Sequence, residues 1–304
     1  MKLLLKRSTI MAITVAGALA VAATPASAIV GGQDATRPYP GMAAMSITFP
    51  GLGIAKCGGV LVHPRFVLTA AHCVSDDAAA PTPVAIPAAN ISVRIGSTDR
   101  TNGGEVATGK KVYLHPNWMW GMPTGRPVAD LALVELTRAV RERVLPIGVR
   151  QVGEADQLRL IGWGLTVFPP PAGTTIPTIL QQRDATRLPA AACAGGFIGG
   201  AEICVSTGAC FGDSGGPALR PLFNGHASRH PIWASVGIAS RETNEENPCG
   251  AASVYTDPTY GPFRTWIFTT IVTRQIQPCT CPPIRTMDAA SSTRMSLLKP
   301  EIVK

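Results

Sequence analysis

Short apolar segments bounded by glycine, proline or asparagine recur about every ten residues along this chain and limit what it can fold into. The chain contains 31 glycines and 27 prolines, which interrupt long helices, and only 15% of its 304 residues are charged. Short apolar runs joined by turns are typical of antiparallel sheets. The sequence therefore predicts an all-β protein whose strands include residues 43–49, 59–62, 66–68, 91–95, 129–136, 157–162, 233–239 and 253–256.

One stretch near the C-terminus follows a different pattern. Phe263, Trp266, Ile267 and Ile271 follow one another at spacings typical of one helix face, which predicts a helix within residues 260–276. The segment that follows is rich in proline, serine and charged residues, and we expect an extended tail there.

The first 28 residues have the pattern of a secretory signal peptide. The cations Lys2, Lys6 and Arg7 precede an apolar run over residues 10–23, and Ala26-Ser27-Ala28 offers the small residues that signal peptidase reads. A membrane anchor is the alternative, but the run is shorter than the roughly 20 residues that a spanning helix needs. We expect a secreted, extracellular protein with no membrane partner after signal removal.

The charge of the mature chain is mildly basic. Loss of the signal leaves 24 Lys and Arg against 19 Asp and Glu, a net charge near +5. These basic residues are scattered and no aromatic residues alternate with them, so nucleic-acid binding has no support.

Cysteines supply a second constraint. Eight cysteines in an exported chain indicate disulfides rather than metal ligands, and no Cys-x2-Cys pair suggests zinc. We expect no metal and no cofactor. Counting alone does not choose among the many possible pairings.

Residues 212–217 read Gly-Asp-Ser-Gly-Gly-Pro and form the sharpest chemical signal. Flanking glycines let the backbone turn tightly and present Ser214 on an exposed turn. A serine hydroxyl is a weak nucleophile until a neighbouring base takes its proton and a third group orients that base. The chain must therefore supply a histidine and a carboxylate.

His72 and Asp130 are the best candidates for these roles. Among five histidines, His72 lies in Thr-Ala-Ala-His-Cys, where small residues permit close packing and Cys73 can fix the backbone. Asp130 directly precedes an apolar strand, and a buried carboxylate needs a partner such as a histidine N–H.

The chain resembles the chymotrypsin/trypsin-like serine peptidases over about residues 29–270. Five segments occur in the order and approximate spacing of that family, and the short alanine-rich signal suggests a secreted bacterial type. The segments are Ile29-Val30-Gly31-Gly32, residues 69–73, Asp130-Leu131-Ala132-Leu133, Gly162-Trp163-Gly164 and residues 212–217.

The resemblance implies two six-stranded antiparallel β-barrels and a C-terminal helix. The expected organisation is a signal peptide at 1–28, a peptidase domain at 29–272 with barrels at roughly 29–145 and 146–272, and a tail at 273–304. The family acts on protein or peptide substrates, and proteinaceous inhibitors are further expected partners.

The resemblance also assigns catalytic roles. Ser214 would attack the scissile carbonyl, His72 would move the proton and Asp130 would hold the imidazole tautomer. The N–H groups of Gly212 and Ser214 would form the oxyanion hole, and Ser240 would support the aspartate. The resemblance also implies disulfides that pair Cys57 with Cys73, Cys193 with Cys204, and Cys210 with Cys249. It leaves Cys279 and Cys281 unassigned.

In this family a new amino terminus pairs with the aspartate before the nucleophile, which implies an ion pair between Ile29 and Asp213. Because Ile29 follows the expected signal cleavage point, signal peptidase itself would create this terminus. A short propeptide removed by a second cut is the alternative.

The expected specificity pocket lacks the aspartate of trypsins, since Gly208 occupies that position. Glu242 and Ser253 stand where open pockets carry glycine, and Phe211 lies beside the pocket. We expect cleavage after small or medium apolar residues, with aromatic residues as the second preference. If the Glu242 side chain points into the pocket, it would instead recruit a basic residue.

Two other functions remain open. A catalytically silent homologue acting as a binding protein would keep the fold, with Glu242 or Phe211 blocking the pocket. An esterase with an α/β-hydrolase fold is disfavoured, because its acid and histidine would follow the serine, whereas here both precede it.

Overall fold

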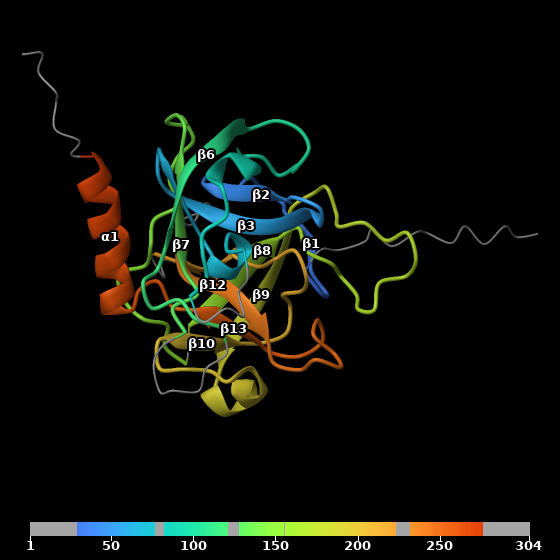
Figure 1. The fold of residues 1–304 in the computed structure, drawn as a ribbon. Helices are drawn as coiled ribbons and strands as arrows, with labels where there is room; N and C mark the ends of the chain where they lie inside the picture. The colour runs from blue at the N-terminus through green and yellow to red at the C-terminus, as the bar shows by residue number, and fades with distance from the viewer. Residues whose placement is uncertain (1–28, 77–81, 121–127, 155, 223–231, 276–304) are drawn as a thin grey trace, which may run out of the picture.

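The computed structural model describes residues 29–76, 82–120, 128–154, 156–222 and 232–275. The predicted signal peptide, residues 276–304 of the predicted tail, and both Cys279 and Cys281 lie outside the described residues. Figure 1 shows β2, β3 and β6 in the upper half of the molecule, β9, β10, β12 and β13 below them, and α1 along one side.

The first barrel closes in the order β2-β3-β4-β7-β6-β5, with antiparallel neighbours throughout. Alternating side chains of its strands fill the interior with Met45, Ile47, Leu68, Val93 and Leu133, all essentially inaccessible to solvent. Its strands are β2 (Met42–Phe49), β3 (Gly53–His63), β4 (Phe66–Thr69), β5 (Ile91–Ile95), β6 (Glu105–Leu114) and β7 (Ala132–Leu136).

The second barrel runs β9-β10-β13-β12-β11-β8 and closes through pairing of β8 with β9. The short β1 (Gln33–Asp34) pairs with the first two residues of β9. Two closed six-stranded antiparallel barrels confirm the predicted fold class. The remaining strands are β8 (Gln157–Gly162), β9 (Gln181–Leu188), β10 (Glu202–Val205), β11 (Pro217–Pro221), β12 (Trp233–Glu242) and β13 (Ser253–Thr256).

The C-terminal helix α1 (Gly261–Gln275) lies within the residues predicted to be helical. Its buried Phe263, Ile267 and Ile271 belong to the same apolar cluster as the first barrel, although the chain enters α1 from the second. His115 packs edge-on between the rings of Phe263 and Trp266, at 5.0 and 4.8 Å between centroids. Among the described residues no helix is long and apolar enough to cross a membrane.

Two glycines bring the barrels into close contact. A β-carbon on Gly58 of β3 would lie 2.7 Å from the Cα of Gly216, which allows no larger residue there. The Gly58 N–H also donates to the carbonyl of Ser214 at 2.7 Å. The first barrel thus helps to fix the loop that carries the serine.

Several predicted strand boundaries are wrong. β3 begins at Gly53, well before the predicted residue 59, and β12 continues to Glu242 beyond the predicted residue 239. The strand predicted for residues 129–136 begins only at Ala132. Ala129 adopts a positive φ of 44°, a conformation outside the strand region, and this bend turns Asp130 away from the strand direction.

Candidate active site

His72 lies in a single helical turn, η1 (Ala71–Cys73), directly after β4. Its backbone N–H donates to Oδ1 of Asp130 at 3.0 Å, and its ring Nδ1 lies 2.8 Å from Oδ2 of the same carboxylate. Asp130 comes just before β7, the strand that pairs with β4. The barrel register therefore brings together two residues that are 58 positions apart.

Asp130 is completely buried, and its carboxylate accepts hydrogen bonds from both His72 and Ser240. The hydroxyl of Ser240, on β12 of the second barrel, donates to Oδ2 at 2.7 Å. Burial alone would raise the pKa of Asp130, but the charge and hydrogen bonds of His72 hold this pKa below its ordinary value. Burial would likewise lower the pKa of His72, and Asp130 outweighs it, so that pKa is raised.

The loop before β11 carries Ser214, and two of its backbone N–H groups have no hydrogen-bond acceptor among the described residues. The N–H groups of Asp213, Gly215 and Gly216 bond to carbonyls, whereas those of Gly212 and Ser214 have no acceptor within the described part of the chain. Phe211 accepts a bond from Leu165 N–H at 2.8 Å. Because a trans peptide points its C=O and N–H in opposite directions, this bond turns the Gly212 N–H away from Leu165.

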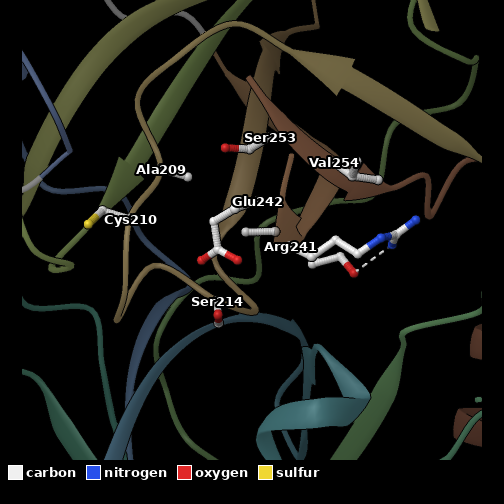
Figure 2. Close-up of a pocket in the computed structure, with 9 residues that line it drawn as sticks. Ala209, Cys210, Ser214, Arg241, Glu242, Ser253 and Val254 are labelled. Atoms are coloured by element: carbon white, nitrogen blue, oxygen red, sulfur yellow. Dashed lines mark hydrogen bonds between the residues drawn. The ribbon is translucent and has the colours of Figure 1, made fainter. Parts of the chain in front are cut away.

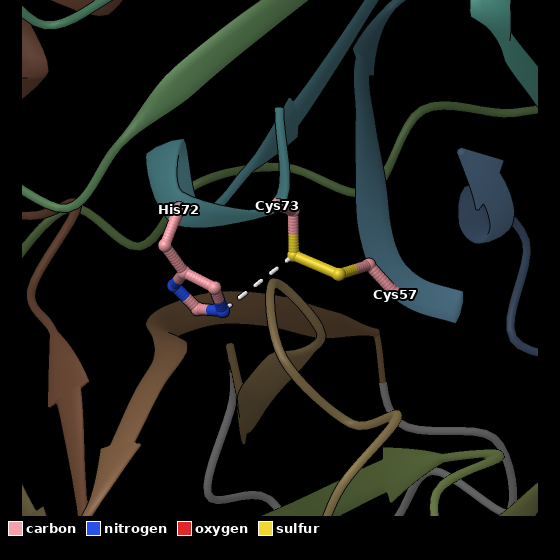
Figure 3. Close-up of side chains that lie close together, drawn as sticks. All are labelled: Cys57, His72 and Cys73. Atoms are coloured by element: carbon pink, nitrogen blue, oxygen red, sulfur yellow. Dashed lines mark hydrogen bonds between the residues drawn. A yellow bond between two sulfur atoms is a disulfide. The ribbon is translucent and has the colours of Figure 1, made fainter. Parts of the chain in front are cut away.

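Ser214 and His72 come from different barrels, and among the described residues no hydrogen bond joins their side chains. His72 Nε2 instead lies 3.7 Å from Sγ of Cys73, whose disulfide to Cys57 Figure 3 shows beside the ring. Cys57, His72 and Cys73 lie close enough to resemble a metal site. Both sulfurs belong to the disulfide, so neither is the thiolate that binds zinc.

Asp213 is buried directly before the serine. Its carboxylate accepts bonds from the N–H groups of Gly164 at 2.8 Å and Cys210 at 3.0 Å. Burial raises the pKa of Asp213 to about 7 despite these bonds. Ile29 is also buried, packs in the core of the second barrel, and has a strained positive φ of 65°.

A small cavity of about 20 Å³ adjoins Ser214. Figure 2 shows the Glu242 carboxylate projecting into it, on the side of Ser214, with Ser253 further in. Two other predicted substrate contacts do not line this cavity. A β-carbon on Gly208 would meet Leu160 and Ile29, so Gly208 faces the barrel core, while Phe211 turns outward and packs on Phe168.

A larger cavity of about 380 Å³ lies beside the first, and Phe211 is one of the residues that line it. Trp120 and Arg241 also line it, and the sequence reasoning missed both. Trp120 packs edge-on against the His72 ring at 5.6 Å between centroids, and Trp118 supports it at 5.7 Å. The cluster of tryptophans at 118 and 120 was the available signal.

Three disulfides fix the surrounding loops in the pairing that the resemblance implies. They are Cys57–Cys73, Cys193–Cys204 and Cys210–Cys249. The first anchors the turn of His72, and the last joins the serine loop to the segment between β12 and β13.

The fold of the chain is similar to that of a solved serine protease. Neuropsin, described as a serine protease expressed in the limbic system of mouse brain, superposes with a TM-score of 0.60 at 24% identity, over 80% of this chain and 100% of that one. At this identity the likeness supports the fold alone.

Sequence relatives carry the comparison further. Granzyme M of Homo sapiens is 29% identical over 67% of this chain and 77% of its own length. A trypsin of Phaedon cochleariae is 30% identical over 63% and 73%, and the chymotrypsin-like elastase family member 1 of Felis catus 28% over 68% and 79%.

These relatives are animal proteins and do not support the bacterial type expected from the signal. The sequence pattern of the Trypsin family matches residues 29–267, most of the chain. The chain therefore belongs to the trypsin-like family of serine endopeptidases, whose members act on proteins or peptides.

Proposed function

We propose that the mature protein is a secreted serine endopeptidase that uses Ser214, His72 and Asp130 through an acyl-enzyme. Ser214 Oγ attacks the scissile carbonyl carbon while His72 Nε2 takes its proton, and His72 then returns this proton to the leaving amine. Water, activated by the same imidazole, releases the acyl group. The N-terminal signal pattern supports secretion.

The observation that carries this proposal is the pair of hydrogen bonds from His72 to the Asp130 carboxylate. With its backbone N–H and Nδ1 both held by Asp130, the imidazole has one ring orientation, and Nε2 is the nitrogen left for proton transfer. The charge of Asp130 stabilises the imidazolium that forms during attack. The hydrogen bond from the Ser214 hydroxyl to Nε2 forms when substrate binds, before the proton is transferred.

The free N–H groups of Gly212 and Ser214 support an oxyanion hole at the same loop. Each such donor typically contributes about 3–4 kcal/mol to stabilising the transition state, because it points at the oxygen where charge develops. Phe211, through its bond to Leu165, keeps one donor in orientation before substrate arrives.

Activation follows from the position of Ile29. A cut after Ala28 releases an amine next to a segment that is already anchored, since Val30 N–H donates to Gly208 carbonyl at 2.8 Å. The buried Asp213 carboxylate, which has no cation among the described residues, is the partner for that amine. Signal cleavage would then also be the activation step.

The pocket supports cleavage after a small or medium apolar residue. Glu242 and Ser253 occupy the space that glycines would leave open, and the remaining cavity of about 20 Å³ leaves no room for an aromatic or arginine side chain unless the lining residues move. Larger side chains enter only if Glu242 moves.

Hydrolysis of a peptide library by the protein starting at Ile29 tests the proposal. We expect turnover in the wild type and a loss of at least about 1000-fold in both Ser214→Ala and His72→Ala. Ser206→Ala, a loop serine outside the cavities, is the matched control and should retain full activity. A folded wild type without turnover would instead favour the silent binding homologue.

A further inference from the structure

Arg241 follows Ser240 on β12 and makes a buried ion pair with Glu202 of β10. Its Nη1 and Nη2 lie 2.6 and 2.8 Å from the two carboxylate oxygens, a two-point contact that fixes the plane of the guanidinium. The side chains are 8% and 0% exposed. Such burial excludes a role as a solvated surface charge.

The other groups around this ion pair are also satisfied. Arg241 Nε donates to the carbonyl of Gly196 at 2.6 Å, and Nη2 donates to that of Phe197 at 3.2 Å. Glu202 accepts a further bond from the Gly199 N–H at 2.7 Å. The guanidinium is therefore held on one side by the last residue of η3 (Ala190–Gly196) and the residue after it, and on the other side by Glu202 of β10.

One N–H group of Arg241 also contacts Ser240, the residue whose hydroxyl donates to Asp130. Nη1 donates to Ser240 Oγ at 3.2 Å, the contact marked by the dashed line in Figure 2. Arginine has donors and no acceptor, so Ser240 must be the acceptor in this contact. The single hydroxyl hydrogen of Ser240 is then committed to Asp130 Oδ2, 2.7 Å away.

We propose that Arg241, held by Glu202, is a positioning residue of the triad that orients the Ser240 hydroxyl toward Asp130 and so fixes the acceptor of His72. The inference rests on the proposed peptidase function. Arg241 itself touches no reacting atom; it acts through Ser240 and through its charge.

Three charged groups affect the pKa of the His72 imidazole. Asp130, just before β7, and Glu242 on β12 raise the pKa of His72, whereas Arg241 on β12 lowers it. Removal of the Arg241 charge should therefore raise the pKa of His72. Because the base must be neutral to accept a proton, the acid limb of kcat/KM would move to higher pH.

The test uses the paired variant Arg241→Met/Glu202→Gln, since removal of Arg241 alone would bury an unpaired carboxylate. We expect kcat to fall about 2- to 12-fold, the equivalent of one hydrogen bond, with KM within about twofold and the acid limb shifted upward. Arg241→Lys should keep the charge, so its acid limb stays near that of the wild type while kcat still falls.

Arg220→Met/Asp156→Asn is the matched control. That pair is joined at 3.0 Å, is similarly buried, and lies away from the triad. It should lose stability without a change in kcat or in the acid limb. A purely structural role for Arg241 would make both double variants behave alike, which overturns the proposal.

Two readouts separate this inference from the proposed function. Proton NMR titration of His72 reports the shift of its pKa without turnover, so it decides the point even if the wild type is inactive. An increase in KM alone would make Arg241 a substrate contact and would contradict positioning. Absence of Ser214-dependent hydrolysis in the wild type would refute the proposed function only.

Discussion

A β-carbon on Gly162 would lie 1.9 Å from Oδ1 of Asp213, so this glycine leaves the space that the buried carboxylate occupies. Gly164 does the same on the other side, where a β-carbon would lie 2.4 Å from Oδ2. The N–H of Gly164 also donates to Oδ1. The Gly-Trp-Gly motif is thus the receptacle for the residue that precedes Ser214.

Gly162→Ala should destabilise the protein by at least about 1–3 kcal/mol, because overpacking against backbone-bonded Asp213 has little room to relax. Urea unfolding measures this change. Gly200→Ala, at a glycine with open space around it, is the matched control and should be nearly neutral. Equal stabilities of the two variants would contradict the receptacle account.

The buried Asp213 predicts a dependence on the amino terminus. Its pKa of about 7 exceeds the ordinary value of 3.8, so in a chain extended beyond Ile29 this group favours folding at low pH and loses that contribution as pH rises through about 7. A free Ile29 amine would pair with the carboxylate and restore stability.

We therefore expect the form starting at Ile29 to be more stable at pH 8 than a form carrying one extra alanine, by up to about 3–5 kcal/mol, and at least tenfold more active. Denaturation and kcat of the two forms check this. Asp213→Asn should remove the difference between them. Equal activity of both forms would rule out the ion pair.

His115 should make docking of α1 sensitive to acid. Burial lowers the pKa of His115 to about 4, below its ordinary 6.5, so the neutral ring stabilises the fold fully above about pH 6.5. This contribution, up to about 3 kcal/mol, is lost as pH falls toward 4. His115→Gln should flatten that part of the stability–pH curve, and a curve parallel to that of the wild type would disprove the role.

Glu242 should set the size of the specificity pocket. Glu242→Ala should raise kcat/KM for peptides with phenylalanine before the cleaved bond by about tenfold or more relative to those with alanine, because one buried aromatic ring gains contact area. Glu245→Ala, which lines only the larger cavity, is the control. A wild-type preference for arginine or lysine that disappears in Glu242→Ala would show that the carboxylate recruits a basic residue instead.

Several elements could be predicted from local pattern because apolar alternation coincides with burial. The predicted boundaries of β5, β8 and β13 agree with the structure to the residue. The pattern does not predict β9, whose sequence QQRDATRL is polar. Its buried Gln182 instead accepts a bond from the Tyr39 hydroxyl at 2.6 Å, a tertiary contact that no local pattern encodes.

The site shows the same division. The resemblance led to His72, Asp130, Ser214 and Ser240, because each lies in a short motif. It did not lead to Arg241, whose partner Glu202 is 39 positions away on β10, a strand that β13 separates from β12. Gly208 was expected beside substrate from its distance to the serine, and the packing of Ile29 and Leu160 around it was not visible in sequence.

Labelling with a fluorophosphonate tests the central claim most directly, because this reagent reacts with an activated serine and needs no knowledge of the substrate. The purified protein starting at Ile29 is treated with the probe beside His72→Ala, and mass spectrometry maps the adduct. The account predicts one adduct on Ser214 that is lost in His72→Ala. A folded wild type that remains unlabelled, or an adduct that persists without His72, would contradict the triad.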